Sequence, residues 1–248
     1  MQGGRVSTIT STREVHGFSE VVLRGYGDLT VEQRDDALGR ETIEIEADEE
    51  LVRRILTEVR GSRLVLGFSM PWYEWLTWWF QWLFLPSRKI RYRLATGRLE
   101  ALSISGAGTV TLPRLDSRRL DLRISGAGKI QGSALKVGDL AARVSGSGKV
   151  ELAGTADRCE VSISGSGNVE LTGMAERFEV AISGSGNVRA VDLQAKSVTA
   201  RISGSGSLTT NAAETLDVNI SGAGNVRYRG NPRISQRISG AGQIRPLT

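Results

Sequence analysis

A tetrapeptide of the form Ser-Gly-(Ala/Ser)-Gly recurs from residue 105 onward, and this repeat constrains the fold more than any other feature of the sequence. Its eight copies lie 18 to 20 residues apart and contain 16 of the 30 glycines, so the glycines mark repeat boundaries and do not indicate disorder. A unit this short cannot bury its own apolar face, whereas units stacked on their neighbours share a continuous core. The copies begin at Ser105, Ser125, Ser145, Ser164, Ser183, Ser203, Ser221 and Ser239.

The residues on either side of each motif alternate between apolar and polar. Positions one, three and five before the motif serine are apolar in most repeats, as in Cys159, Val161 and Ile163. A period of two is typical of β-strands, and glycine supplies the backbone angles of a tight corner. We therefore predict an all-β chain that forms a parallel β-helix, or β-solenoid, with about 18–20 residues per coil. Equivalent apolar side chains should form columns inside a rod about 38 Å long, at roughly 4.8 Å per coil.

Composition excludes several classes of function. The single histidine, His16, and the single cysteine, Cys159, cannot supply a zinc site, a disulfide framework or a Ser–His–Asp triad. The net charge of +5 comes without a run of basic residues, which does not indicate a nucleic-acid partner. The row after the glycines lacks the aspartates of a calcium-binding β-roll. We expect Cys159 to be a buried, inert thiol, and we expect no metal, no cofactor and no catalytic residue.

Two polar rows precede the motif and should lie side by side on one exposed face. The row four positions before the serine holds carboxylates, and the row two positions before it holds arginines such as Arg123 and Arg143. A solvated salt-bridge lattice is the simplest interpretation. The alternative is a carbohydrate-active β-helix enzyme that uses these carboxylates. The motif serine hydroxyls should also form a hydrogen-bonded ladder. The carboxylates in question are Asp121, Glu160, Glu179 and Asp217.

The chain divides by pattern into four parts. We predict an N-terminal tail (1–14), a capping part of the solenoid (15–69), a Trp-rich helical insertion (70–88) and the regular solenoid repeats (89–248). Within the capping part, residues 21–31 are a degenerate strand–corner–strand unit and 42–46 alternate as a strand. Asp48 should cap a helix over residues 49–58. Such an irregular part would cover the open end of the solenoid.

The insertion contains all five tryptophans of the chain, between Pro71 and Pro86. A helix of this length, about 22 Å, is too short to cross a membrane by itself. It could pack on the solenoid, lie at a membrane surface with the basic residues that follow it, or contact sister subunits. We favour the last two, which can coexist. The predicted contact residues are Trp72, Trp75, Leu76, Trp78, Trp79, Phe80, Trp82, Leu83 and Phe84.

The repeated Ile-Ser-Gly-Ser-Gly-Asn-Val at 163–169 and 182–188 resembles the bacterial family described as "putative auto-transporter adhesin, head GIN domain". The ending Tyr-Arg-Gly-Asn-Pro at 228–232 and the stretches 13–18 and 45–51 are similar to that family as well. The resemblance implies a parallel β-helix-like fold in exported or lipid-anchored envelope proteins, similar to the wider "toastrack" group. It implies no catalytic residues. The Trp-rich insertion departs from the usual pattern of the family.

These observations predict a non-enzymatic, adhesin-like binding or scaffold protein of the bacterial cell envelope. Residues 72–85 should attach it to a membrane surface, to sister subunits or to both, and its outer faces should present a surface to a glycan or protein ligand. The first residues show no apolar segment typical of a signal peptide, so export by that route is not indicated. The alternatives are the carbohydrate-active enzyme and a soluble homo-oligomer without lipid.

Overall fold

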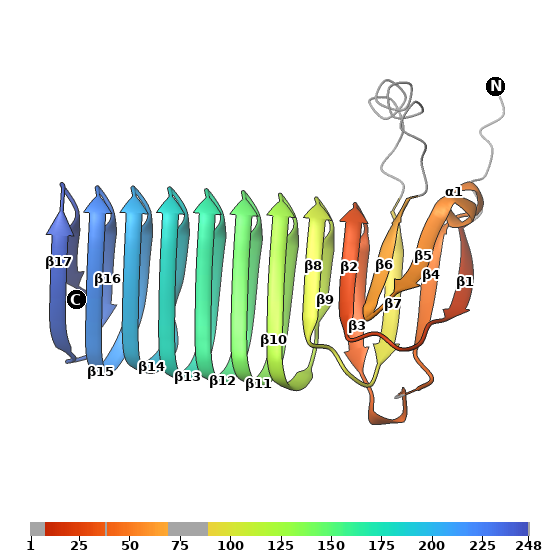
Figure 1. Cartoon of the computed structure of the whole chain (residues 1–248), viewed down its shortest axis with the longest axis horizontal. Helices are drawn as coiled ribbons and strands as arrows, with labels where there is room; N and C mark the ends of the chain where they lie inside the picture. Colours follow the sequence, from red (N-terminus) through yellow and green to blue (C-terminus); the bar gives the residue numbers. More distant parts are fainter. Residues whose placement is uncertain (1–7, 38, 69–88, 248) are drawn as a thin grey trace, which may run out of the picture.

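The computed structural model describes residues 8–37, 39–68 and 89–247. These residues form a parallel β-solenoid whose coils stack along one long axis, with an irregular cap at the N-terminal end (Figure 1). The fold class predicted from the repeat is therefore confirmed. The predicted Trp-rich helix at 70–88 and the start of the predicted tail lie outside the described residues.

In the regular part, a single long strand makes most of each coil. Each strand starts just after a glycine corner, descends, bends at the opposite corner and ascends to the next glycine corner (Figure 1). We call the stretch after a glycine corner the descending arm and the stretch before the next one the ascending arm. These strands are β11 (Lys129–Gly146), β12 (Lys149–Gly165), β13 (Asn168–Gly184), β14 (Asn187–Gly204) and β15 (Ser207–Gly222), preceded by the ascending arm β10 (Leu115–Gly126).

Equivalent residues of successive coils form columns, as the repeat predicts. Val161 pairs with Val180 across β12 and β13, and the same column continues through Ala200 to Val218. None of these four residues is more than 3% exposed. The inward positions of both arms meet in one apolar core along the rod, and burial of that core is the main stabilising contribution to folding.

The two glycines of each motif are required for different reasons. The first, such as Gly184, has φ +121°, and a Cβ there would lie 2.6 Å from the carbonyl oxygen of Gly165. The second, such as Gly186, would place a Cβ 2.6 Å from Cγ2 of Ile163. The corners stack through their backbones, where the N–H of Ser185 donates to the carbonyl of Gly165. Contrary to our expectation, no hydrogen bond joins the motif serine hydroxyls in the described part of the chain, and these serines are exposed.

The first coils come from segments that are not in sequence order. β2 (Glu20–Gly25) and β3 (Asp28–Gln33) form a coil that pairs with β8 (Ala101–Gly106) and β9 (Thr109–Leu112) on one side. On the other side it pairs with β6 (Arg63–Phe68) and β7 (Arg91–Thr96). The strand–corner–strand unit predicted around residues 21–31 is thus confirmed. β6 ends at Phe68 and β7 begins at Arg91, so the predicted insertion 70–88 falls between these two strands in the sequence.

The N-terminal end of the rod is closed by antiparallel strands. β4 (Thr42–Asp48) pairs with β7 and β1 (Thr8–Glu14) pairs with β4, while β5 (Ile55–Arg60) pairs with β6. A short 3-10 helix, η1 (Asp35–Ala37), precedes β4. The helix predicted over 49–58 is only partly correct: α1 spans Glu49–Arg54, and Asp48 makes no side-chain cap hydrogen bond to it. From residue 55 the chain is a strand, because pairing with β6 outweighs local helical preference.

At the C-terminal end the regular pattern continues to the last described residues. β16 (Asn225–Arg229) pairs with β15, and β17 (Arg233–Ser239) pairs with the ascending arm of β15. β18 (Gln243–Pro246) pairs with β16. Among the described residues, no further strand pairs with β17 or β18.

Candidate binding faces of the solenoid

The outer face of the ascending arms carries the charge lattice that the sequence predicts. Arg143 donates to both carboxylate oxygens of Asp121, each at 3.0 Å, and to Oε1 of Glu160 at 3.3 Å. Arg123 also donates to Asp121. One coil further, Arg158 lies 2.9 Å from Glu179. The salt-bridge interpretation is thus confirmed for these residues.

The lattice gives no support to the enzyme alternative. The carboxylate of Asp121 is only 7% exposed and is held by two arginines, and Glu160 and Glu179 are each paired with an arginine. Asp217 lies on the same face without an ion pair in the described part of the chain. None of these four carboxylates lines the descending groove described below or the smaller hollow at Thr155, Met174 and Gln194. Asp121, Glu160 and Glu179 are therefore engaged in ion pairs between side chains of the lattice.

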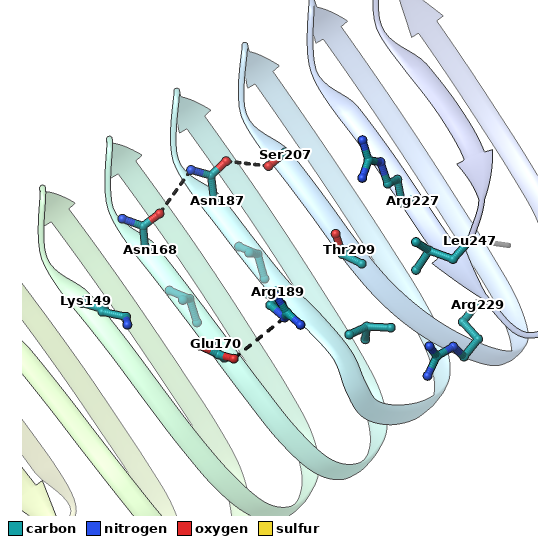
Figure 2. A pocket seen from close by; sticks show the side chains of 13 residues that line it. Lys149, Asn168, Glu170, Asn187, Arg189, Ser207, Thr209, Arg227, Arg229 and Leu247 are labelled. Atoms are coloured by element: carbon teal, nitrogen blue, oxygen red, sulfur yellow. Dashed lines mark hydrogen bonds and ion pairs between the residues drawn. The ribbon is translucent and has the colours of Figure 1, made fainter.

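The outer face of the descending arms has a different composition. The first outward row after the glycine corner is rich in amides and hydroxyls, and in β13 to β15 it forms a ladder. Asn187 donates through Nδ2 to Oδ1 of Asn168 at 3.2 Å and accepts at its own Oδ1 from the hydroxyl of Ser207 at 2.5 Å (Figure 2). A ladder of this kind keeps neighbouring coils in register and fixes the direction of each amide.

Earlier in the same face the polar residues are ion-paired. Glu151 of β12 accepts hydrogen bonds from Lys149, from Lys129 and from Gln131, whose Nε2 lies 2.7 Å away. These donors, Lys149 first, lower the pKa of Glu151 to about 2. The same contact raises the pKa of Lys149. One carboxylate thus holds two lysines here, so this part of the face keeps one positive charge.

A groove of about 730 Å³ lies on the descending face between β13 and the C-terminal residues. β14 supplies one wall of the groove. Between Ala190 and Gln194 it contains three residues, Val191, Asp192 and Leu193, that have no partners in β15. Leu247 lies at the other side of the groove, where its N–H donates to the carbonyl of Tyr228 at 2.7 Å (Figure 2). We call this feature the descending groove. Its polar lining consists of Lys149, Asn168, Glu170, Asn187, Arg189, Ser207, Thr209, Arg227 and Arg229.

The descending groove is positively charged. Arg189 lies 3.9 Å from Glu170, a loose contact between two largely exposed side chains. Arg227 and Arg229 have no ion pair among the described residues, and the sequence contains no Asp or Glu after Asp217. Two guanidinium groups therefore face solvent without a carboxylate to neutralise them. Such groups bind carboxylates and phosphates in planar, two-point contacts.

The sequence did not identify this groove. The amide row has no aspartates and so argues only against calcium, and neither the longer β14 nor the position of Leu247 beside β16 is marked by a motif. After Asp217 the sequence contains several arginines but no Asp or Glu, and this excess of positive charge is the signal that could have indicated the groove. The residues predicted to contact membrane or subunits, 72–85, lie outside the described residues.

Other features exclude particular chemistry in the described part of the chain. Cys159 is 2% exposed, and burial raises the pKa of its thiol to about 12, as expected for an inert core residue. In the ranges 8–37, 39–68 and 89–247, no group of three or more His, Cys, Asp or Glu side chains could hold a metal ion. No helix in those ranges is long and apolar enough to cross a membrane.

Solved structures share this architecture over nearly the whole chain. A "putative lipid binding protein" from Parabacteroides distasonis is 24% identical, with a TM-score of 0.87 over 99% of this chain and 98% of that one. A "putative adhesin" from Parabacteroides merdae is 23% identical, with a TM-score of 0.86 over the same shares. A "putative adhesin" from P. distasonis is 25% identical, with a TM-score of 0.84 over 98% of each chain.

No curated protein matches the chain. The family described as "putative auto-transporter adhesin, head GIN domain" matches residues 17–232, from the first coil through β16. This range includes seven of the eight Ser-Gly-(Ala/Ser)-Gly corners, the amide ladder and most of the descending groove. The chain therefore belongs to the family of the auto-transporter adhesin head GIN domain.

Proposed function

We propose that this protein is a non-enzymatic, adhesin-like binding protein of the cell envelope and that the descending groove holds a linear anionic polymer. The observation that carries the proposal is the presence of Arg227 and Arg229, unpaired, beside a ladder of aligned amides and hydroxyls. Guanidinium groups would bind carboxylates or phosphates of the polymer, and the ladder would bind its hydroxyls.

The spacing of the groove suits a polymer that runs parallel to the rod axis. Asn168, Asn187 and Ser207 come from successive coils and so repeat at about 4.8 Å, close to the length of one sugar residue in an extended polysaccharide. Arg189 and Arg227 occupy the same row two coils apart, at roughly 9.6 Å. An extended chain in which every second sugar turns an anionic group toward the groove would match both rows. An anionic polysaccharide is therefore the ligand class that we propose.

Attachment would take place at the opposite end of the rod. Leu66 near the end of β6 is in register with Leu23, and Arg91 at the start of β7 is in register with Asp28. The chain therefore leaves and re-enters the fold at the glycine-corner edge of the cap. From β7 to β16 there are eight coil steps, or about 38 Å. Residues 72–85 would attach the rod to a membrane surface or to sister subunits, and the groove would lie toward the other end of the rod.

Binding of surface-coupled polygalacturonate, with neutral dextran as the comparison, tests the groove. We expect the protein to bind polygalacturonate, more weakly as salt rises, and to ignore dextran. The double variant Arg189→Ser/Arg227→Ser should bind about tenfold more weakly, because two of the groove's cations are lost. The matched control is Arg177→Ser/Arg201→Ser, which removes the same charge from exposed positions on the ascending face.

Equal losses in the two double variants would show that net charge alone attracts the polymer, and the proposed site would be wrong. Binding to dextran as strong as to polygalacturonate would exclude the ionic part of the proposal. Turnover of any glycan that disappears in Glu160→Gln would instead revive the enzyme alternative.

Liposome flotation tests the attachment. Wild-type protein should float with anionic vesicles, and a Trp75/Trp78/Trp79/Trp82→Ser variant should remain at the bottom of the gradient. If neither floats while only the wild type is larger than a monomer by light scattering, sister subunits are the partner. If the two proteins behave identically in both measurements, residues 72–85 have no role in attachment.

A further inference from the structure

The C-terminal end of the solenoid has an unpaired edge. β17 pairs only with β15, and β18 pairs only with β16, so each leaves one row of backbone N–H and C=O groups without a strand beside it in the described part of the chain. Every residue of β17 is exposed. At the other end of the rod β1 and β5 also have one strand partner each among the described residues, but there α1 packs against β4 and β1 and buries Leu51 and Val52. A free edge of this kind is a template for a further strand.

The core columns also end at this edge. Ile234 continues the column of Leu216, and Ile238 continues that of Ile220. Leu216 and Ile220 are at most 1% exposed, whereas Ile234 is 42% and Ile238 38% exposed. These two isoleucines occupy the core positions of β17, and no coil of the described residues covers them. A strand added here would bury them with its own inward side chains.

The outward positions of β17 determine the charge of an acceptable partner. Arg233 and Arg237 alternate there with serines, and Arg245 lies on β18. None of these arginines has an ion pair among the described residues, and residues 218–248 contain no Asp or Glu. Side chains directly opposite on neighbouring strands lie about 5 Å apart, so like charges repel and opposite charges attract.

This charge pattern rejects a second copy of the same end. Two C-terminal edges pairing with each other would bring the arginines of both β17 strands together without any carboxylate. The N-terminal end of another copy offers no surplus of acid either, because Glu49 is paired with Arg53 and Glu58 with Arg60. The partner that fits must supply carboxylates itself.

We infer that the edge formed by β17 and β18 is a docking site for an extended acidic peptide segment of another protein, in which Glu or Asp alternates with apolar residues. Its backbone would pair with the free edge of β17, its apolar side chains would cover Ile234 and Ile238, and its carboxylates would face Arg233 and Arg237. Strand addition to a sheet edge combines backbone hydrogen bonds for affinity with side-chain alternation for specificity.

Fluorescence anisotropy with a labelled peptide of alternating Glu and Val tests the inference. We expect binding of this peptide, but not of a Lys/Val peptide or of a peptide with the same composition in which all Glu precede all Val. Hydrogen exchange should slow in residues 233–239 on addition of the alternating peptide, because their amides gain partners. Arg233→Ser/Arg237→Ser and Ile234→Ser/Ile238→Ser should each weaken binding about tenfold.

Two matched variants keep this site distinct from the descending groove. Arg189→Ser/Arg227→Ser should leave peptide binding unchanged, and so should Arg177→Ser/Arg201→Ser. Loss of binding only in the first of these would place the peptide in the groove as a simple polyanion and overturn the inference. Equal binding of the block peptide would overturn it as well.

Self-association of the protein is the remaining outcome, and it would give Arg233 and Arg237 a different role. If no peptide binds and Arg233→Ser/Arg237→Ser self-associates in sedimentation velocity, the arginines only keep two rod ends apart, and the docking site does not exist. If wild-type protein already associates and Ile234→Ser/Ile238→Ser does not, a second copy occupies the edge and the inference is wrong.

Discussion

Gly186 shows, at the scale of single residues, how little space a glycine corner leaves. A Cβ at this position would lie 2.6 Å from Cγ2 of Ile163 and 2.9 Å from the carbonyl oxygen of Gly167. The neighbouring Ser185 is exposed, and alanine takes its place in the motifs that start at Ser105, Ser125, Ser221 and Ser239. Of these two adjacent residues, Ser185 can therefore be replaced by alanine, whereas Gly186 has no room for a Cβ.

We expect Gly186→Ala to lower the free energy of unfolding by about 1–3 kcal/mol, because the added methyl group forces two coils apart. Ser185→Ala, the matched control, should change it by less than about 0.5 kcal/mol. Urea unfolding followed by circular dichroism measures both values. Equal effects of the two substitutions would show that the corner does not limit how closely the coils stack.

Because the thiol of Cys159 is buried, we expect the free energy of unfolding to depend on pH. Burial raises its pKa from the usual 9.0 to about 12, so between these values the unfolded chain loses the proton and the folded chain keeps it. The thiol therefore lowers the free energy of unfolding as pH rises, by about 1 kcal/mol at pH 10. Cys159→Val, which copies Val198 of the same column, should lose less stability between pH 8 and pH 10. A thiol reagent that labels the native protein as fast as the unfolded one would contradict this account.

At the scale of elements, pairing between strands decides what local sequence leaves open. The spacing of Leu51, Ile55 and Val59 predicts a helix over 49–58, yet Ile55–Arg60 forms β5 because β6 is available to pair with it. Strands β10 to β18 could be predicted because each repeats the same motif. The antiparallel strands β1, β4 and β5 carry no motif, so their partners could not be predicted.

Asp121 provides a test of the lattice that joins the ascending arms. We expect Asp121→Asn to lower the free energy of unfolding by about 2 kcal/mol, because two arginines lose the nearly buried carboxylate that holds them. Glu160→Gln, at a more exposed carboxylate of the same lattice, should cost less than about 1 kcal/mol. Thermal unfolding of the two variants at one pH gives the comparison. A larger loss in Glu160→Gln would mean that burial does not set the strength of these pairs.

At the scale of the whole molecule, the rod is a sum of nearly equivalent coils. The repeat predicted the columns, the corners and the ascending charge lattice, because all three depend only on the identity of residues one coil apart. The descending groove could not be predicted, since it depends on the extra length of β14 around Val191 and on Leu247 lying beside β16. The proposed binding site is therefore formed by irregular features of the rod, whereas the fold is determined by the repeated columns and corners.

Removal of one complete coil should leave a folded, shorter rod. Deletion of residues 149–167 joins Gly148 to Asn168, so each column loses one member and closes again. We expect an unchanged circular dichroism spectrum and a maximum dimension in small-angle scattering that is about 5 Å shorter. Deletion of residues 149–157 alone, which joins a corner directly to an ascending arm, should prevent folding. A folded product from the partial deletion would show that register between coils is not required.

The interchangeable corners have a consequence for how such a gene can change. Each corner is encoded by nearly the same short stretch, so unequal recombination between two of these stretches would add or remove one whole coil and leave the cap and the last strands intact. The length of the rod could therefore change during evolution in steps of about 4.8 Å while both of its ends stay the same.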